Sequence, residues 1–279
     1  MNVWVAGARP RTLGAGVVPV LAGAAAAETF IGWRFLAALM VALGLQVGVN
    51  LANDYFDGIR GVDRPERLGP PRLVATGAAS PRAVLVAALV SIGAAGFAGL
   101  ALALATEPVL ILFVGALALV ATFAYSGGPR PYAGLGLGEL MVFLFFGLMA
   151  TCGTVLGLLA VAILVANNLR DIPTDAAAGK RTLAVRLGEA RTRAFYRACV
   201  VLAFATIVVG VSVDLVDERV GLTQWGLLGL VGWVLAIRPM DAVGEATGAS
   251  LVGVLTGTAA VHAATGLLLA FGLVLARAA

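Results

Sequence analysis

The chain has 279 residues, of which 61% are hydrophobic and only 12% charged, about half the charged share of an ordinary soluble domain. This composition excludes a water-soluble globular protein and predicts a chain folded in a lipid bilayer. The net charge is +4, yet there is no basic helix and no aromatic–basic module, so a nucleic-acid binder is also excluded.

Apolar segments that approach the length of a membrane crossing recur along the whole chain. A hydrocarbon core about 30 Å thick needs about 20 apolar residues per helix, and fewer where the bilayer is thinned. Ahead of the first segment there is no apolar run with a cleavage site, so no signal peptide is expected. The predicted spans are 12–28, 35–53, 83–105, 108–125, 139–167, 195–213, 222–237 and 250–276.

The basic residues between these spans predict the topology. With the N-terminus on the cytoplasmic side, most of the 19 Lys and Arg residues fall on that side, as the positive-inside rule expects. The stretch 139–167 is an exception, because its flanking arginines require an even number of crossings and it is too short for two. It is interpreted as a re-entrant hairpin buried in protein or, preferably, as a region that lacks a connecting segment near 154–157. The predicted fold is an all-α polytopic membrane protein with about nine transmembrane helices in its parent layout.

A polar cluster ends the predicted span 35–53. It reads Asn-Leu-Ala-Asn-Asp-Tyr-Phe-Asp over residues 50–57. On a helix, Asn50, Asp54 and Asp57 share one face because they are spaced i, i+4, i+7. Three side chains with oxygen donors are therefore expected to converge at this membrane end.

A second polar cluster lies farther along the chain and repeats the first. Asn167 precedes Asp171 by four residues, the same spacing as in the first cluster, and Asp175 follows. Pro173 disfavours helix at the preceding residue and can begin a new helix, so Asp175 is expected just beyond the membrane end. The repeat predicts one transmembrane domain, 1–279, with two quasi-repeated halves of about 1–137 and 138–279.

The two clusters together predict a divalent-metal site. One cluster alone is explained equally well by a solvated helix end, but two sets of carboxylates at membrane depth are costly and repel one another unless cations lie between them. Hard oxygen ligands without a Cys and His set favour Mg²⁺ or Mn²⁺ over zinc. Magnesium is commonly shared with substrate phosphate, so the site indicates a diphosphate. The expected metal ligands are Asp54, Asp57, Asp63, Asp171 and Asp175.

Basic residues beside the clusters are placed to bind that diphosphate. Lys180, the only lysine, follows the second cluster, and Arg130 lies in a turn-rich loop predicted on the same face. Their charges bind phosphate oxygens and stabilise a departing diphosphate, although Arg130 is equally well explained as a topology marker. The residues expected to contact the diphosphate are Lys180, Arg130, Arg60, Asn50 and Asn167.

Four other polar residues are interpreted as structural. Cys152 and Cys199 lie in apolar runs and are expected to be buried free thiols. Glu139 is expected to begin a helix. His262, the only histidine, is expected to pack or to hydrogen-bond between helices, and it is not assigned as a general base.

At the two clusters the sequence resembles the UbiA superfamily of intramembrane aromatic prenyltransferases. Within that superfamily, segments 53–63, 167–175 and 179–188 are similar to the 1,4-dihydroxy-2-naphthoate polyprenyltransferases of menaquinone synthesis. The 4-hydroxybenzoate enzymes typically place an aspartate at the position of Gly61, whereas here Asp63 comes two residues later. This spacing favours the naphthoate branch.

The resemblance implies transfer of a polyprenyl group from its diphosphate to 1,4-dihydroxy-2-naphthoate, with loss of CO₂ and formation of demethylmenaquinol. Tyr125 is expected either to stabilise the allylic cation through its π face or to anchor its span at the interface. The protein is expected among the lipids of a bacterial plasma membrane, as a multi-pass protein with its active site on the cytoplasmic face. The residues implied to be catalytic, together with Mg²⁺, are Asp54, Asp57, Asp171, Asp175 and Lys180.

Two alternatives remain open from the sequence. Another acceptor, such as 4-hydroxybenzoate, would leave the chemistry unchanged. A transporter with repeated halves also places acids near helix breaks. It predicts those acids near the bilayer midplane, however, whereas here they gather at one interface beside basic loops, which favours a phosphate site.

Overall fold

The structure, a computed structural model, describes residues 2–63, 72–149, 154–214 and 222–279. Every regular element in these ranges is helical, which confirms the all-α prediction. Five of the helices are long and apolar enough to cross a membrane, and two shorter apolar helices accompany them. The chain divides into two compact units, of which the first comprises Met1–Gly16, Ile31–Gly138 and Asp171–Arg186, and the second Val17–Phe30, Glu139–Arg170 and Leu187–Ala279.

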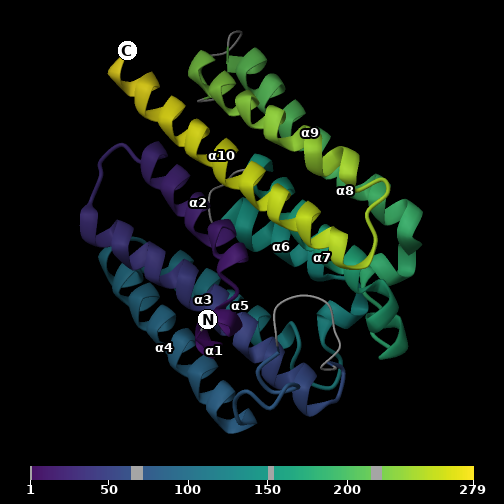
Figure 1. The fold of residues 1–279 in the computed structure, drawn as a ribbon. Helices are drawn as coiled ribbons and strands as arrows, with labels where there is room; N and C mark the ends of the chain where they lie inside the picture. Colours follow the sequence, from purple (N-terminus) through teal and green to yellow (C-terminus); the bar gives the residue numbers. More distant parts are fainter. Residues whose placement is uncertain (1, 64–71, 150–153, 215–221) are drawn as a thin grey trace. The chain divides into compact units, whose positions relative to one another are not determined.

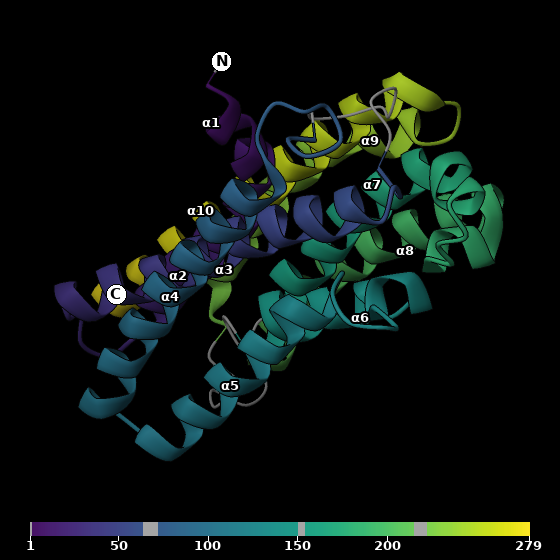
Figure 2. The ribbon, with the colours of Figure 1, turned by 90° about the horizontal axis from the view of Figure 1, so that it is seen from below.

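The first unit is built around three long helices. Figures 1 and 2 show α3 and α4 side by side, with α5 turning back from the end of α4. Both α4 and α5 begin at a proline, a position where the missing N–H would have no partner inside the helix. The elements are α1 (Val3–Ala8), α3 (Gly32–Ile59), α4 (Pro81–Ala105), α5 (Pro108–Ala124) and the 3₁₀ turn η1 (Tyr132–Leu135).

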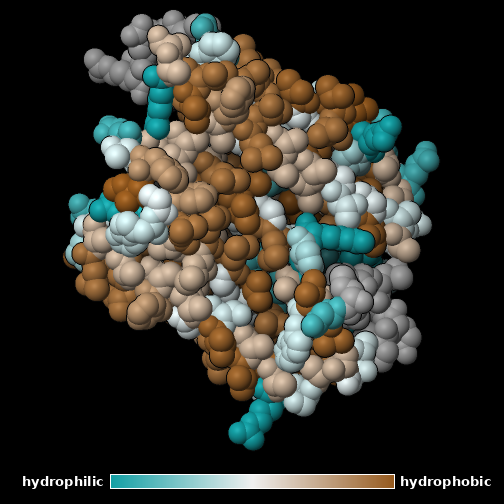
Figure 3. Space-filling view, turned by 60° about the vertical axis from the view of Figure 1, so that its left-hand side comes forward, coloured by the Kyte–Doolittle hydropathy of each residue, from teal (hydrophilic) through white to brown (hydrophobic). Residues whose placement is uncertain are grey.

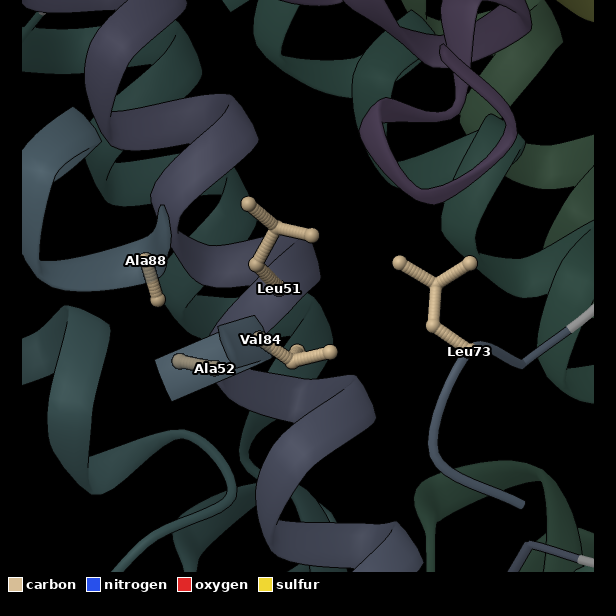
Figure 4. Close-up of a cluster of buried hydrophobic side chains, with 5 residues drawn as sticks. All are labelled: Leu51, Ala52, Leu73, Val84 and Ala88. Atoms are coloured by element: carbon tan, nitrogen blue, oxygen red, sulfur yellow. The ribbon is translucent and has the colours of Figure 1, made fainter. Parts of the chain in front are cut away.

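Helices α3 and α4 approach closely because small residues line their contact. A Cβ atom on Gly44 would lie 2.8 Å from the Ser91 carbonyl oxygen, so only glycine allows this spacing. Toward the end of α3 the contact becomes a cluster of buried apolar side chains, shown in Figure 4. Its members are Leu51, Ala52, Leu73, Val84 and Ala88.

The outer faces of α4 and α5 carry large apolar side chains. Phe97 is 78% exposed and Val109 83% exposed, and Figure 3 shows one face of the molecule covered largely by hydrophobic side chains. Continuous apolar surface of this kind is unfavourable in water and favourable against lipid tails. The prediction of a multi-pass membrane protein is confirmed in this respect.

The second unit is organised around the C-terminal helix α10, which lies along η3 and α9 (Figure 1). Tyr196 on α8 and Thr258 on α10 share a hydrogen bond of 2.6 Å between their hydroxyl oxygens. The predicted span 222–237 is 3₁₀ helix in its first part and α-helix in its second. The elements are α8 (Leu183–Asp214, interrupted at Gly188), η3 (Gln224–Val231), α9 (Gly232–Ala242), η4 (Gly248–Ser250) and α10 (Leu251–Ala278); α2 (Pro10–Ala26) begins in the first unit and continues in the second.

The stretch predicted as the single span 139–167 forms two helical arms. The first arm is α6 (Gly138–Val142), continued by the π-helix η2 (Phe143–Met149), and the second is α7 (Thr154–Ala177). The arms pack closely, since a Cβ on Gly157 would lie 2.7 Å from the Gly147 Cα. Two closely packed helical segments therefore form within this stretch, in agreement with the hairpin alternative, and the absence of a connecting segment stays a prediction.

The cysteines and the histidine that were predicted to be structural can be compared with the structure. Cys199 is a buried free cysteine, as predicted, and Cys152 lies outside the described residues. His262 is buried on α10, and neither ring nitrogen has a hydrogen-bond partner among the described residues. It therefore packs between helices, and the alternative of an interhelical hydrogen bond is not realised.

Candidate active site

The first polar cluster lies on the last three turns of α3. Asp54 and Asp57 are 2% and 3% exposed, and Asn50 is buried with them. The helix runs without a break to Ile59, so the three side chains keep the spacing that places them on one face. The Asn50 amide donates to the Ala8 carbonyl oxygen at 3.1 Å, and this bond fixes its amide at the end of α1.

Asp54 anchors a turn of the backbone. Its two carboxylate oxygens accept hydrogen bonds from the backbone N–H groups of Leu73, at 2.8 Å, and Val74, at 3.0 Å. Each carboxylate oxygen has a second lone pair, so this function is compatible with a metal ion at the same carboxylate. The sequence offered no sign of the turn-anchoring function, because the turn and the aspartate lie on separate segments.

Asp57 is paired with Lys180. The Lys180 Nζ and the Asp57 Oδ2 are 3.1 Å apart, and both side chains are largely buried. Burial by itself would lower the pKa of the Lys180 ammonium, but the negative charges of Asp57 and Asp175 outweigh it and raise that pKa above its ordinary value. The protonated Lys180 amine is therefore stabilised by the negative charge of one carboxylate from each cluster.

The second cluster is carried by the last two turns of α7. Asp171 and Asp175 are 2% and 4% exposed. The prediction that Pro173 begins a new helix is wrong, because α7 continues through it to Ala177. A proline there removes one backbone hydrogen bond, a loss that is tolerated close to the end of a helix. The chain then turns at Gly179, whose φ is +72°, and the Lys180 N–H donates to the Asp175 carbonyl oxygen at 2.8 Å.

Asn167 and its neighbour Asn168 are both hydrogen-bonded within the second unit. The Asn167 side-chain oxygen accepts from the Arg170 guanidinium at 2.8 Å. The Asn168 amide donates to the Glu139 carboxylate at 2.8 Å, and both residues are buried. Glu139 thus links the start of α6 to the polar turn of α7, a function beyond the helix-start carboxylate expected of it.

Asp63, predicted as a metal ligand, is ion-paired. Its carboxylate lies 3.1 Å from the Arg72 Nε, with both side chains buried. A buried ion pair of this geometry neutralises the aspartate locally. The sequence did not predict the pairing of Arg72 with Asp63.

The loop after α5 brings two tyrosines to this unit. The rings of Tyr125 and Tyr132 stack edge to face, with centroids 5.4 Å apart and planes at 85°. Burial, with a smaller contribution from Tyr125, raises the pKa of the Tyr132 hydroxyl. The same loop passes Lys180, whose Cγ would lie 3.7 Å from a Cβ on Gly134. Tyr132 was not singled out in the sequence, although its position after a Pro-rich turn marked the loop.

Arginines 60 and 130 differ in their surroundings. Arg130 is exposed in the loop after α5. The Arg60 guanidinium donates to the carbonyl oxygens of Ser126 and Gly128, both at 2.6 Å, and lies 5.7 Å from the centre of the Phe56 ring. Of the two arginines predicted to contact diphosphate, Arg60 thus has a defined intramolecular partner.

The donor set fits magnesium shared with a phosphate. In the part of the chain that the structure describes, no three acidic, histidine or cysteine side chains form a group able to hold a metal ion by themselves. Magnesium usually takes one or two carboxylates and completes its shell with water and phosphate oxygens. Buried carboxylates beside one ammonium suit that division of ligands.

Comparison with known proteins identifies the family. Residues 16–249 match the UbiA prenyltransferase family. The chain belongs to this family. A protein of Mycobacterium tuberculosis named 1,4-dihydroxy-2-naphthoate octaprenyltransferase is 45% identical over 277 residues, covering 91% of this chain and 91% of that protein. The Escherichia coli protein of the same name is 36% identical and covers 72% of this chain and 73% of that one.

Solved structures of UbiA homologues share the fold. A homologue from Archaeoglobus fulgidus bound to DMAPP and Mg²⁺ aligns with a TM-score of 0.60 at 14% identity, covering 96% of this chain and 99% of that one. The apo structure of a homologue from Aeropyrum pernix K1 aligns with a TM-score of 0.64 at 18% identity, covering 95% and 98%. These likenesses establish the UbiA fold for the chain.

Proposed function

We propose that this UbiA-family protein transfers a polyprenyl group from polyprenyl diphosphate to 1,4-dihydroxy-2-naphthoate, releasing CO₂ and diphosphate and forming demethylmenaquinol for menaquinone synthesis. Four relatives named 1,4-dihydroxy-2-naphthoate octaprenyltransferase are 36–46% identical to this chain, and a fifth is 32% identical. The observation that carries the proposal is the position of Lys180, whose ammonium is paired with Asp57 of one cluster and is also stabilised by the charge of Asp175 of the other. A single diphosphate bound there would be in reach of both clusters.

Mg²⁺, or Mn²⁺ in its place, would be held by one or two carboxylates drawn from Asp54, Asp57, Asp171 and Asp175, with water and diphosphate oxygens as its other ligands, and would supply charge stabilisation for the diphosphate. Lys180 donates to an oxygen of the departing group, and Arg130, exposed in its loop, binds an outer phosphate oxygen. Asn50 orients the diphosphate from the helical turn that precedes Asp54, and a contact of Asn167 with the diphosphate stays a prediction from the sequence. Asp63 is assigned to the same charge network through its ion pair with Arg72.

The bond changes balance without an external base. The allylic C–O bond breaks heterolytically, and the diphosphate leaves with the electron pair. The ring carbon that bears the carboxylate attacks the allylic cation, and loss of CO₂ returns an electron pair to the ring. Tyr125 and Tyr132, stacked edge to face, present π faces that stabilise the cation while apolar helices exclude water.

The protein's surroundings follow from the same assignments. Apolar outer faces place it in a membrane as a multi-pass protein. We assign it to the bacterial plasma membrane with the diphosphate site on the cytoplasmic side, the side that the basic loops favour. The donor's long polyprenyl tail is apolar and would extend from the diphosphate site into lipid-facing surroundings.

The test is an assay of purified protein in lipid vesicles with a long polyprenyl diphosphate and one of two acceptors. We expect prenylated product and CO₂ from 1,4-dihydroxy-2-naphthoate, and loss of both with EDTA. Product from 4-hydroxybenzoate alone would correct the acceptor and keep the chemistry, and no product from either acceptor would reject the proposal. Asp175→Asn is expected to abolish turnover, whereas Asp241→Asn, at an exposed aspartate outside the site, serves as the matched control.

A further inference from the structure

Arg60 lies where a phosphate ligand was predicted, yet its hydrogen bonds connect protein to protein. Two of its N–H groups donate to the carbonyl oxygens of Ser126 and Gly128 at 2.6 Å each. Two parallel donors on a rigid, planar guanidinium match a pair of carbonyls in one turn, and such a pair fixes orientation as well as distance. The guanidinium therefore holds the Ser126–Gly128 turn against the end of α3.

Other contacts support the same junction. The Ser126 hydroxyl donates to the Asn53 side-chain oxygen at 2.8 Å, and both residues are buried. The Phe56 ring lies beneath the turn, so a Cβ on Gly127 would come within 2.9 Å of the ring. Gly128 has φ +77°, a conformation that favours glycine. The Ser126–Gly128 turn therefore packs closely against the end of α3.

The turn controls where the following loop lies. Tyr125 precedes it directly, and the Tyr125 carbonyl oxygen accepts from the Ala133 N–H at 3.2 Å. Between these two residues lies Arg130, and Tyr132 stacks on Tyr125. The side chains assigned to the phosphate and to the cation are therefore carried by one loop that is fastened at its base by Arg60.

We propose that Arg60 is a positioning residue: its guanidinium clamps the Ser126–Gly128 turn to α3 and thereby holds Tyr125, Arg130 and Tyr132 in register with Lys180. The proposal rests on the proposed function, since that function defines what the loop must position. It assigns Arg60 an effect on turnover through the loop, in place of direct contact with the diphosphate.

The first experiment measures amide hydrogen exchange of the substrate-free protein in lipid. Arg60→Ala and Arg60→Lys are both expected to raise exchange in 126–136 at least severalfold, because a lysine ammonium on its flexible stem lacks the rigid planar fork that fits both carbonyls at once. Gly128→Ala is expected to produce the same pattern by straining the turn. The matched control is Arg82→Lys, at an exposed arginine at the start of α4. Unchanged exchange in both Arg60 variants would overturn the clamp, whatever the enzyme's acceptor is.

The second experiment separates positioning from phosphate binding. Arg60→Lys is expected to lower kcat about 10- to 100-fold, as far as Arg60→Ala does, since misplacing catalytic groups by about 1 Å has effects of that size. In a double-mutant cycle with Arg130→Ala, the combined loss is expected to be much smaller than the product of the single losses, because both act through one loop. Independent, multiplicative losses, or near-normal activity of Arg60→Lys, would identify Arg60 as a phosphate ligand and refute the proposal.

Discussion

Replacing Lys180 by methionine tests the centre of the proposed site, because it removes the only lysine ammonium and keeps an unbranched side chain that is one atom shorter. The ammonium is 3.1 Å from the Asp57 carboxylate, and their side chains are 16% and 4% exposed. Removing one partner of a buried ion pair costs about 3–5 kcal/mol. Because the Lys180 side chain retains some contact with solvent, we expect a loss nearer 2 kcal/mol in the free energy of unfolding.

The same substitution should also slow the chemistry. Loss of a donor that stabilises charge on a leaving group lowers kcat about 100- to 1,000-fold. Turnover of polyprenyl diphosphate and dihydroxynaphthoate in lipid vesicles gives kcat, and thermal unfolding in detergent gives the stability change. The control is Arg181→Gln, which removes a positive charge from the next, exposed residue and is expected to leave both quantities nearly unchanged.

A double variant distinguishes the two effects. Adding Asp57→Asn to Lys180→Met removes the unpaired buried charge, so stability should return toward that of the native protein. Activity should stay lost, because the double variant lacks both the ammonium and the carboxylate. Activity of Lys180→Met within threefold of native, or a double variant less stable than the single one, would refute the assigned function of this pair.

Three further predictions concern the surrounding contacts. Asp54→Asn should abolish turnover in a folded protein and raise amide exchange at Leu73 and Val74, since an asparagine can accept only one of the two backbone hydrogen bonds; normal exchange there would contradict the anchoring function. Glu139→Ala should lower stability by about 1–3 kcal/mol by leaving the buried Asn168 amide unpaired, whereas Glu139→Gln, which keeps the acceptor oxygen, should cost much less in thermal unfolding. The pKa of Lys180 is raised in the folded protein. The ion pair with Asp57 is therefore fully stabilising below the ordinary lysine pKa of about 10.4, and this stabilisation is lost as pH rises through the folded pKa. A loss of kcat/KM below pH 8 that disappears in an active Lys180→Arg variant would contradict this.

The sequence predicted those parts of the fold that depend on periodicity and composition. Each predicted span overlaps a helix of the structure, and α3 carries Asn50, Asp54 and Asp57 in an unbroken register. The prediction of a new helix at Pro173 was wrong. Local preference disfavours helix before a proline, yet α7 continues through Pro173 to Ala177. The two arms within 139–167 were foreseen only as an alternative, since no local signal marks the close approach of Gly147 and Gly157.

The contacts of the site were harder to predict because they join segments distant in sequence. Spacing on one helix indicates which side chains share a face, but it says nothing about which loop returns to meet them. Arg60 illustrates the limit, since its position after an aspartate cluster suggested phosphate, whereas its hydrogen bonds go to the Ser126–Gly128 turn. The Asp63–Arg72 pair shows a different limit, because an expected metal ligand pairs with an arginine nine residues later in the same α3–α4 connection, and spacing in an irregular segment does not predict such a contact.

The end of α3 combines two functions that mutagenesis normally treats as separate. Asp54 holds the Leu73–Val74 turn, Asp57 holds Lys180, and Arg60 holds the turn after Tyr125. Loss of activity after changing any of these residues therefore does not by itself identify a metal or phosphate ligand. Titration of activity with Mg²⁺ makes the distinction, because a lost ligand shifts the magnesium requirement upward and a lost anchor lowers the maximal rate at saturating magnesium.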